Sequence, residues 1–148
     1  MSISIEIVHE VTADLVKAMT TLIPQLSQSA PQQSLESLAA IVHSPATTLF
    51  IARDNHGQIV GSLTLAVFSI PTGVRAWVED VVVDSAARGL GVGSVLCNAA
   101  IKRSAELGAV SIDLTSRPSR ESANRLYVKL GFERRETNMY RYTAKTKV

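Results

Sequence analysis

The sequence has few of the features that mark secreted, membrane or redox proteins. Cys97 is its only cysteine, so no disulfide can form within the chain, and this fits a reducing compartment. The longest apolar stretch, residues 63–70, is far too short to span a bilayer. Residues 1–10 lack the basic and apolar regions of a signal peptide. We therefore expect a cytoplasmic protein with no membrane partner.

The sequence also lacks a large excess of charge of one sign and a cluster of metal ligands. The formal net charge is only +2, which gives no electrostatic basis for capturing nucleic acid. His9, His43 and His56 lie far apart and no Cys/His cluster occurs, so we expect no metal site. The composition, 46% hydrophobic and 19% charged, is typical of a globular protein. A length of 148 residues suits a single domain, expected to span residues 1–148.

The hydrophobic pattern predicts a mixture of strands and helices. Residues 3–7 alternate apolar and polar side chains, as a half-buried strand does, and residues 13–24 form an amphipathic helix after the N-cap residue Thr12. The turn at residues 54–57 contains Asn and Gly and predicts an antiparallel hairpin. The remaining elements are expected, in chain order, as a helix at 35–43, strands at 48–53, 59–70 and 75–83, a helix at 92–105, a strand at 110–115, a helix at 120–130, strands at 132–136 and 139–143, and a frayed tail at 145–148.

The stretch VEDVVVDSAARGLGVGSVL, residues 78–96, predicts a strand, a tight loop and a helix. Gly89, Gly91 and Gly93 stand at alternate positions between the two elements. Such a loop directs backbone N–H groups toward the space above the helix N-terminus, where the helix dipole favours an anion. The sequence therefore predicts a phosphate-binding site at this loop.

The glycine spacing argues against two common phosphate-binding loops. A dinucleotide-binding fingerprint that starts at Gly89 would need a small residue at Ser94, which satisfies it only loosely, and one that starts at Gly91 would meet Leu96. A Walker loop needs lysine after its last glycine, where Ser94 stands. The antiparallel hairpin that precedes the loop is further evidence against a nucleotide-binding domain.

Residues 88–93, Arg-Gly-Leu-Gly-Val-Gly after the strand VVVDS, resemble the Arg/Gln-x-x-Gly-x-Gly motif of the GNAT acetyltransferase superfamily, whose loop holds the pyrophosphate of acetyl-coenzyme A (acetyl-CoA). The expected order β-α-α-β-β-β-α-β-α-β-β is also that of the GNAT fold, an α/β (α+β) domain with a mixed central sheet flanked by helices. The resemblance implies acetyl-CoA as co-substrate. It assigns cofactor contacts to Val81, Val82, Val83, Arg88, Gly89, Leu90, Gly91, Val92, Gly93 and Ser94, with strand backbone at Val81 and Val83 pairing with the pantetheine arm.

The segment ANRLYVKLGF, residues 123–132, is similar to the second signature of the family, a helix bearing Leu-Tyr that ends at Gly-Phe. The resemblance makes Tyr127 the general acid that protonates the departing thiolate. Asn124 lies one turn earlier on the same helical face and is a candidate cofactor contact. The commoner family pattern has its Asn where this chain has Arg120, so either residue remains a candidate.

Glu79 is the candidate general base. In a regular strand Trp77, Glu79, Val81 and Val83 share one face and Asp80 lies on the other, so only one of the adjacent acids can face the thioester. Glu-Asp at this strand resembles some amino-sugar acetyltransferases of the family. An exposed acid that is only solvated or ion-paired is the equally weighted alternative.

The expected activity is direct transfer of the acetyl group to a primary amine of a small molecule or peptide, without a covalent intermediate. Cys97 has no neighbouring histidine and is interpreted as a packed residue. The alternative is a non-catalytic acyl-CoA-binding or sensing module, which would not need Tyr127 and Glu79. The acceptor is not identified by the sequence, and the family resemblance is compatible with a homodimer.

Overall fold

The computed structural model describes residues 2–145, so the expectation for residues 146–148 lies outside the described residues. The chain divides into two compact units, Met1–Thr115 and Ser116–Val148.

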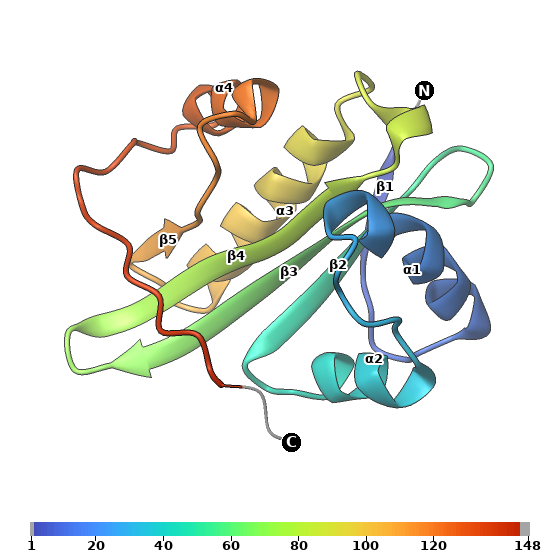
Figure 1. Cartoon of the computed structure of the whole chain (residues 1–148), viewed down its shortest axis with the longest axis horizontal. Coiled ribbons are helices and arrows are strands. Elements are labelled where there is room, and N and C mark those ends of the chain that lie inside the picture. Colours follow the sequence, from blue (N-terminus) through green and yellow to red (C-terminus); the bar gives the residue numbers. More distant parts are fainter. Residues whose placement is uncertain (1, 146–148) are drawn as a thin grey trace. The chain divides into compact units, whose positions relative to one another are not determined.

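The first unit is built on a five-stranded mixed sheet in the order β1-β2-β3-β4-β5 (Figure 1). Its strands are β1 (Ser4–Ile7), β2 (Thr47–Arg53), β3 (Ile59–Ile70), β4 (Gly73–Val83) and β5 (Ser111–Asp113). Strands β1 to β4 pair antiparallel, and β5 pairs parallel to β4. The hairpin predicted at residues 54–57 is confirmed as the β2–β3 connection.

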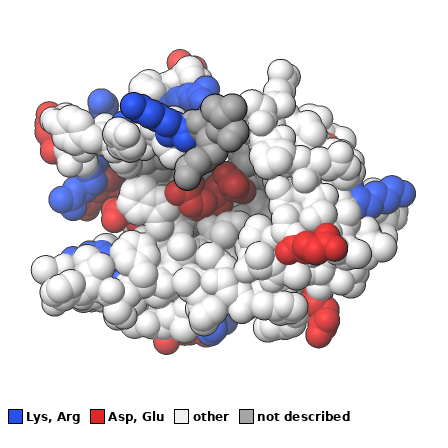
Figure 2. All heavy atoms as spheres, turned by 60° about the horizontal axis from the view of Figure 1, so that its bottom comes forward, with Lys and Arg blue, Asp and Glu red and all other residues white. Residues whose placement is uncertain are grey.

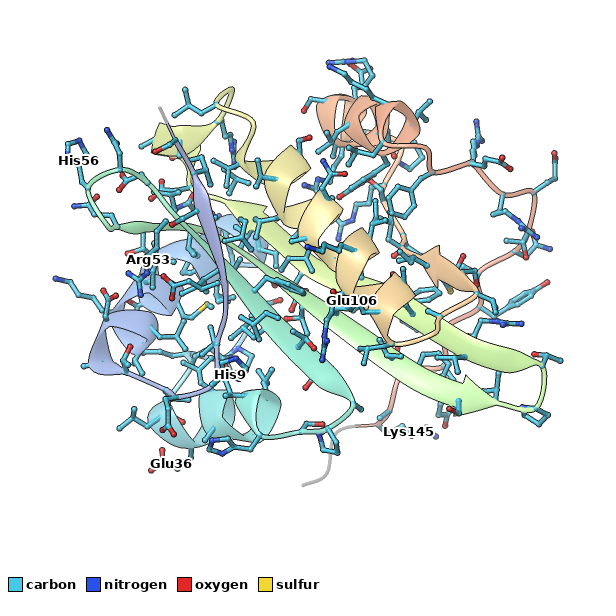
Figure 3. The ribbon with its side chains drawn as sticks, turned by 180° about the vertical axis from the view of Figure 1, so that it is seen from behind. His9, Glu36, Arg53, His56, Glu106 and Lys145 are labelled. Carbon is cyan, nitrogen blue, oxygen red and sulfur yellow. The ribbon has the colours of Figure 1, made fainter. Side chains whose placement is uncertain are left out.

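Helices cover both faces of this sheet (Figures 1 and 3). Helices α1 (Ala13–Leu26) and α2 (Leu35–Val42) pack on one face, where Leu15, Leu38 and Ile51 belong to one buried cluster. Helix α3 (Val92–Glu106) packs on the opposite face, where Val92 lies against Gly61 of β3. Burial of apolar side chains on both faces is the main favourable contribution to folding.

Helix α1 extends further than the sequence predicted. Its N-cap is Thr12, as expected, and the Thr12 side chain accepts a hydrogen bond from the Leu15 N–H at 3.2 Å. The helix was expected to end at Pro24, but it continues to Leu26. The Ser27 N–H still bonds the Ile23 carbonyl at 2.8 Å, and Leu26 packs against the core, so the last turn tolerates the missing proline N–H.

Arg53, at the end of β2, connects three elements of the first unit (Figure 3). Its guanidinium donates to Glu6 of β1 at 2.6 Å and to Asp14 of α1 at 3.0 Å. It also donates to the Gly57 carbonyl in the β2–β3 turn at 2.8 Å. The two carboxylates raise the pKa of Arg53, chiefly through the Asp14 hydrogen bond, so Arg53 stays charged.

Strand β4 contains a bulge beside the candidate base. Glu79 is paired with Thr64 of β3. Further along, Val82 is paired with Ser62, so β4 has one residue more than β3 over this stretch. Asp80 absorbs the irregularity with φ 50, the left-handed region that non-glycine residues rarely adopt.

The bulge corrects the predicted faces of β4. Trp77 and Glu79 share a face, as expected, but Val83 does not join them. Paired residues of antiparallel strands point to the same side, so Val82 lies on the face of Glu79 and Val83 on the opposite face. Val82 accordingly belongs to the buried cluster beneath α1 and α2. Strict alternation fails here because an inserted residue reverses every later position.

The second unit contains helix α4 (Glu121–Lys129) and an irregular segment after it. Strands were predicted at residues 132–136 and 139–143, and this is wrong, because the structure has no strand in residues 132–145. Every residue from 133 to 145 is exposed. Without a buried face, a two-stranded ribbon is at best marginally stable in water.

Within residues 2–145, no helix combines the length and apolar character needed to cross a membrane. Figure 2 shows one face on which basic and acidic side chains are interspersed among uncharged residues, in keeping with the net charge of +2.

Candidate active site

The end of β4 is fixed by contacts with other elements of the first unit. The Asp84 N–H donates to the Val60 carbonyl of β3 at 2.8 Å. The 3-10 turn η1 (Ser85–Ala87) follows, and the Asp84 side chain caps it by accepting from the Ala86 N–H at 3.1 Å. The Ser85 N–H donates to Oε1 of Gln25 in α1 at 2.8 Å. The chain therefore enters the glycine loop from a well-anchored position.

The glycine loop leaves its backbone donors available. Gly89 and Gly91 have φ 80 and φ 81, and Gly91 is the N-cap of α3 without a side-chain hydrogen bond. Within the described part of the chain, the N–H groups of residues 89–94 make no hydrogen bond. These donors lie at the positive end of the α3 dipole, which is a favourable place for a phosphate group.

The surroundings of the loop are compatible with a bulky anion. A Cβ atom added at Gly89 or Gly91 would meet nothing within 4 Å, so these glycines are required by backbone conformation rather than by crowding. Arg88 is exposed and forms no ion pair with any described residue. Its guanidinium is thus available to a phosphate.

Gly61 of β3 sets how closely α3 approaches the sheet. A Cβ atom at this position would come within 2.9 Å of Val92 Cγ1 and 3.1 Å of Leu96 Cδ1. Contacts this short are not tolerated without movement. Gly61 therefore supports the first turn of α3, which carries the free N–H groups.

The backbone of β4 is open beside the predicted pantetheine contacts. Strand β5 pairs only with residues 75–77 of β4, so no described strand covers residues 78–83 on that side. Val82 is 5% exposed, with its side chain in the core, so only its backbone can meet a ligand. Val81 and Val83 are half-buried. Their predicted pairing with pantetheine stays a prediction.

Glu79 is exposed and held by a neighbouring side chain. The indole N–H of Trp77 donates to Oε2 of Glu79 at 2.5 Å. The two residues lie on the face of the sheet that α1 and α2 cover in part. The bond fixes the carboxylate and leaves its other oxygen able to accept a proton.

Tyr127 and Asn124 lie in the second unit, whereas Glu79 and the glycine loop lie in the first. The Tyr127 side chain is 7% exposed, and its ring packs edge-on against Phe132 with centroids 5.9 Å apart. Asn124 Nδ2 donates to the carbonyls of Arg117 and Arg120, both at 2.9 Å. These bonds hold the entry to α4 and use the amide nitrogen of Asn124, so its predicted cofactor contact, which stays a prediction, is left to Oδ1.

Cys97 is a packed residue of α3. It is 1% exposed, and burial raises the pKa of its thiol from 9.0 to about 11. A thiol with this pKa is almost entirely protonated near neutral pH and is a poor nucleophile. No group of three or more His, Cys, Asp and Glu side chains among residues 2–145 is arranged to hold a metal ion.

The sequence did not reveal three residues that shape this site. Gln25 follows Pro24, where the sequence predicts the helix to end, and it lies 60 positions away from Ser85, so no local pattern could have linked them. Asp84 was recognised only as the end of a strand. The bulge at Asp80 had one signal, a polar residue in an apolar strand, which an exposed acid explains equally well.

Comparison with known proteins bears on the fold and the family of this chain. No curated protein has a sequence significantly similar to this chain. A solved structure of a transcriptional regulator from Bacillus halodurans is 28% identical, with a TM-score of 0.80 over 96% of this chain and 100% of the other. An aminoglycoside acetyltransferase from a soil metagenomic sample is 20% identical, with a TM-score of 0.83 over 97% of each chain. Glucosamine-6-phosphate N-acetyltransferase from Arabidopsis thaliana is 18% identical, with a TM-score of 0.80 over 97% of this chain and 100% of the other.

The last two similarities concern the fold alone, and they confirm the predicted GNAT-like architecture. The sequence profile of the Acetyltransferase (GNAT) family matches residues 15–132, most of the chain, including the glycine loop and the Tyr127 helix. The protein therefore belongs to the GNAT family of acetyltransferases, enzymes that use acetyl-CoA as the acetyl donor.

Proposed function

We propose that this protein transfers the acetyl group of acetyl-CoA directly to a primary amine of a small molecule or peptide. The observation that carries the proposal is the open N-terminal end of α3, whose N–H groups at residues 89–94 have no partner in the described chain. This end follows the strand that bears Glu79 after η1 and the glycine loop. A carbonyl–sulfur bond breaks and a carbonyl–nitrogen bond forms, and the chain supplies binding, orientation and proton transfer.

The first unit provides the donor-binding groups in this proposal. The N–H groups of residues 89–94 and the Arg88 guanidinium bind the pyrophosphate of acetyl-CoA. The uncovered backbone of Val81 and Val83 pairs with the amide groups of its pantetheine arm. Both contacts place the thioester near β4, which orients it for attack by the amine.

Glu79 and Tyr127 provide the two proton transfers. Glu79, oriented by the Trp77 indole, accepts the proton that the amine loses as it attacks. Tyr127 donates a proton to the departing sulfur. The family match extends from the first unit into the second, which supports treating residues 1–148 as one functional domain.

The acceptor is proposed only as a class, a primary amine. In the GNAT family the segment between the first two helices helps to shape the acceptor site. Here that segment, residues 27–34, contains Ser, Gln, Ala and Pro and no charged side chain. It offers hydrogen bonds and no countercharge, which is compatible with an amine on a polar small molecule or on a peptide.

The reaction is tested by following the release of free coenzyme A thiol from acetyl-CoA in the presence of a panel of amines. We expect continuing, amine-dependent turnover that falls about 100-fold in Tyr127→Phe, with little change in acetyl-CoA affinity. Tyr142→Phe is the matched control, because Tyr142 is 86% exposed in the same unit. Equal turnover in wild type and Tyr127→Phe would remove Tyr127 from the mechanism.

The same assay tests the base. Glu79→Gln is expected to lower kcat/KM about 100-fold, because the amide cannot accept the amine proton. Asp80→Asn controls for loss of the neighbouring charge and keeps a residue that tolerates the left-handed conformation. Tight acetyl-CoA binding without turnover on any amine would favour a binding or sensing module instead.

A further inference from the structure

Gln25 links the helix that precedes the α1–α2 segment to the turn that precedes the glycine loop. Its side-chain amide bridges two backbone groups that are distant in the sequence. Nε2 donates to the Thr21 carbonyl one turn earlier in α1 at 3.0 Å, and Oε1 accepts from the Ser85 N–H at 2.8 Å. The bond to Thr21 fixes the rotamer of the Gln25 side chain, and in this rotamer Oε1 faces the Ser85 N–H.

The bond to Ser85 stands at a transition in backbone hydrogen bonding. From Asp84 to Ala87 each N–H is bonded within the protein: Asp84 to Val60, Ser85 to Gln25, and Ala86 and Ala87 to Asp84. From residue 89 to residue 94 the N–H groups make no hydrogen bond within the described chain. Among the described residues, Gln25 is the only one in another element whose side chain hydrogen-bonds to residues 84–87.

We propose that Gln25 is a positioning residue for the pyrophosphate-binding loop, which it holds by fixing η1 through the Ser85 N–H. The proposal rests on the proposed acetyl-CoA function of this loop. Gln25 does not touch the phosphates in this role. It restricts η1, so that Arg88 and the N–H groups that follow need less ordering when the pyrophosphate binds.

The role differs from simple stabilisation of the core. Gln25 is half-buried, and both of its hydrogen bonds are made to backbone atoms rather than to buried polar side chains. Gln25→Met keeps the length and most of the packing of the side chain and removes both bonds. It therefore tests positioning with little change in volume.

The test compares three ligands by calorimetric titration with the purified full chain: acetyl-CoA, dephospho-coenzyme A and S-acetylpantetheine. The first two carry the pyrophosphate and the third does not. For Gln25→Met we expect about fivefold weaker binding of both pyrophosphate ligands and unchanged binding of S-acetylpantetheine, as for the loss of one ordinary hydrogen bond. Gln58→Met is the control, because Gln58 is exposed in the β2–β3 turn and its side-chain amide makes no hydrogen bond with a described residue.

A second variant removes the donor of the same hydrogen bond, the Ser85 N–H. Ser85→Pro removes the donated N–H, and the extended conformation of Asp84 (φ -52, ψ 134) is compatible with a following proline. If the bond carries the effect, Gln25→Met together with Ser85→Pro weakens pyrophosphate binding no more than either change alone.

The outcomes separate this proposal from the proposed function. Equal weakening for all three ligands, or no weakening for any, overturns the role of Gln25 while wild-type binding of acetyl-CoA still supports the cofactor site. Independent, additive losses in the double variant also overturn it. Failure of the wild type to bind acetyl-CoA overturns the proposed function itself.

Discussion

The two ends of helix α3 have glycines in nearly the same conformation but differ in their hydrogen bonding. Gly91 at the start has φ 81, Gly108 after the end has φ 82, and a Cβ atom at either would meet nothing within 4 Å. At the C-terminal end the N–H groups of Leu107, Gly108 and Ala109 all bond to carbonyls of the helix. At the N-terminal end those of residues 89–94 make no bond within the described chain.

This difference separates a structural glycine from a functional one. Backbone conformation and empty space are the same at both positions, so neither property marks a binding site. The hydrogen bonding does distinguish the two ends: no side chain caps the N-terminal donors of α3, unlike those of α1, so these donors are available to a ligand. Three measurements would sharpen or break this comparison.

The largest effect is expected in amide hydrogen exchange. With acetyl-CoA at about 100 times its dissociation constant, exchange of the N–H groups of residues 89–94 should slow about 100-fold. The N–H groups of Leu107, Gly108 and Ala109 already have partners and should change little. Site-resolved exchange followed by NMR measures both ends in one sample. Equal protection at the two ends would contradict the assignment of the open end as the binding site.

The second largest effect is expected in the pH dependence of stability, through Cys97, which lies between the two ends of α3. Its thiol has a pKa of about 11 when folded and near 9.0 when unfolded, so its contribution to stability is complete below about pH 9 and is lost as the pH rises toward 11. We expect the free energy of unfolding of the wild type to fall about 2 kcal/mol more than that of Cys97→Ala between about pH 8 and pH 11. Urea unfolding at each pH measures it, and lysines and tyrosines cancel in the comparison. Parallel pH dependence in the two proteins would mean that Cys97 is accessible to solvent.

The smallest effect is expected from alanine at the two glycines. Each substitution places a side chain in the left-handed region, at a cost of about 1 kcal/mol to stability. Gly91→Ala should in addition weaken acetyl-CoA binding about tenfold, because strain relief displaces the loop donors, whereas Gly108→Ala should leave binding unchanged. Thermal unfolding and calorimetric titration separate the two quantities. Weaker binding in Gly108→Ala would show that the two ends are not independent.

Sequence reasoning succeeded where a property is local. The glycine loop, the N-cap at Thr12 and the β2–β3 hairpin each depend on a few adjacent residues, and the structure confirms each. Periodicity also placed Trp77 and Glu79 on one face of β4, and their hydrogen bond confirms it.

The sequence did not predict features that depend on contacts between residues far apart in the chain. The bulge at Asp80 exists only in the register between β3 and β4, so the sequence of one strand does not contain it. Two closing strands were predicted at residues 132–136 and 139–143, yet pairing needs a surface to bury, and residues 133–143 are all exposed. The Gln25–Ser85 bond joins positions 60 apart and leaves no mark on either segment.

Gly61 is another residue whose importance depends on a distant part of the chain, and this has a consequence for related sequences. It lies mid-strand, away from the loop, yet any larger residue would press on Val92 and Leu96 and tilt the first turn of α3. Selection for acetyl-donor use would therefore act on position 61 as well as on the loop itself. Among related sequences, the size of the residue at position 61 should covary with that of the residue at position 92. A relative that no longer uses an acetyl donor would be free to change both residues.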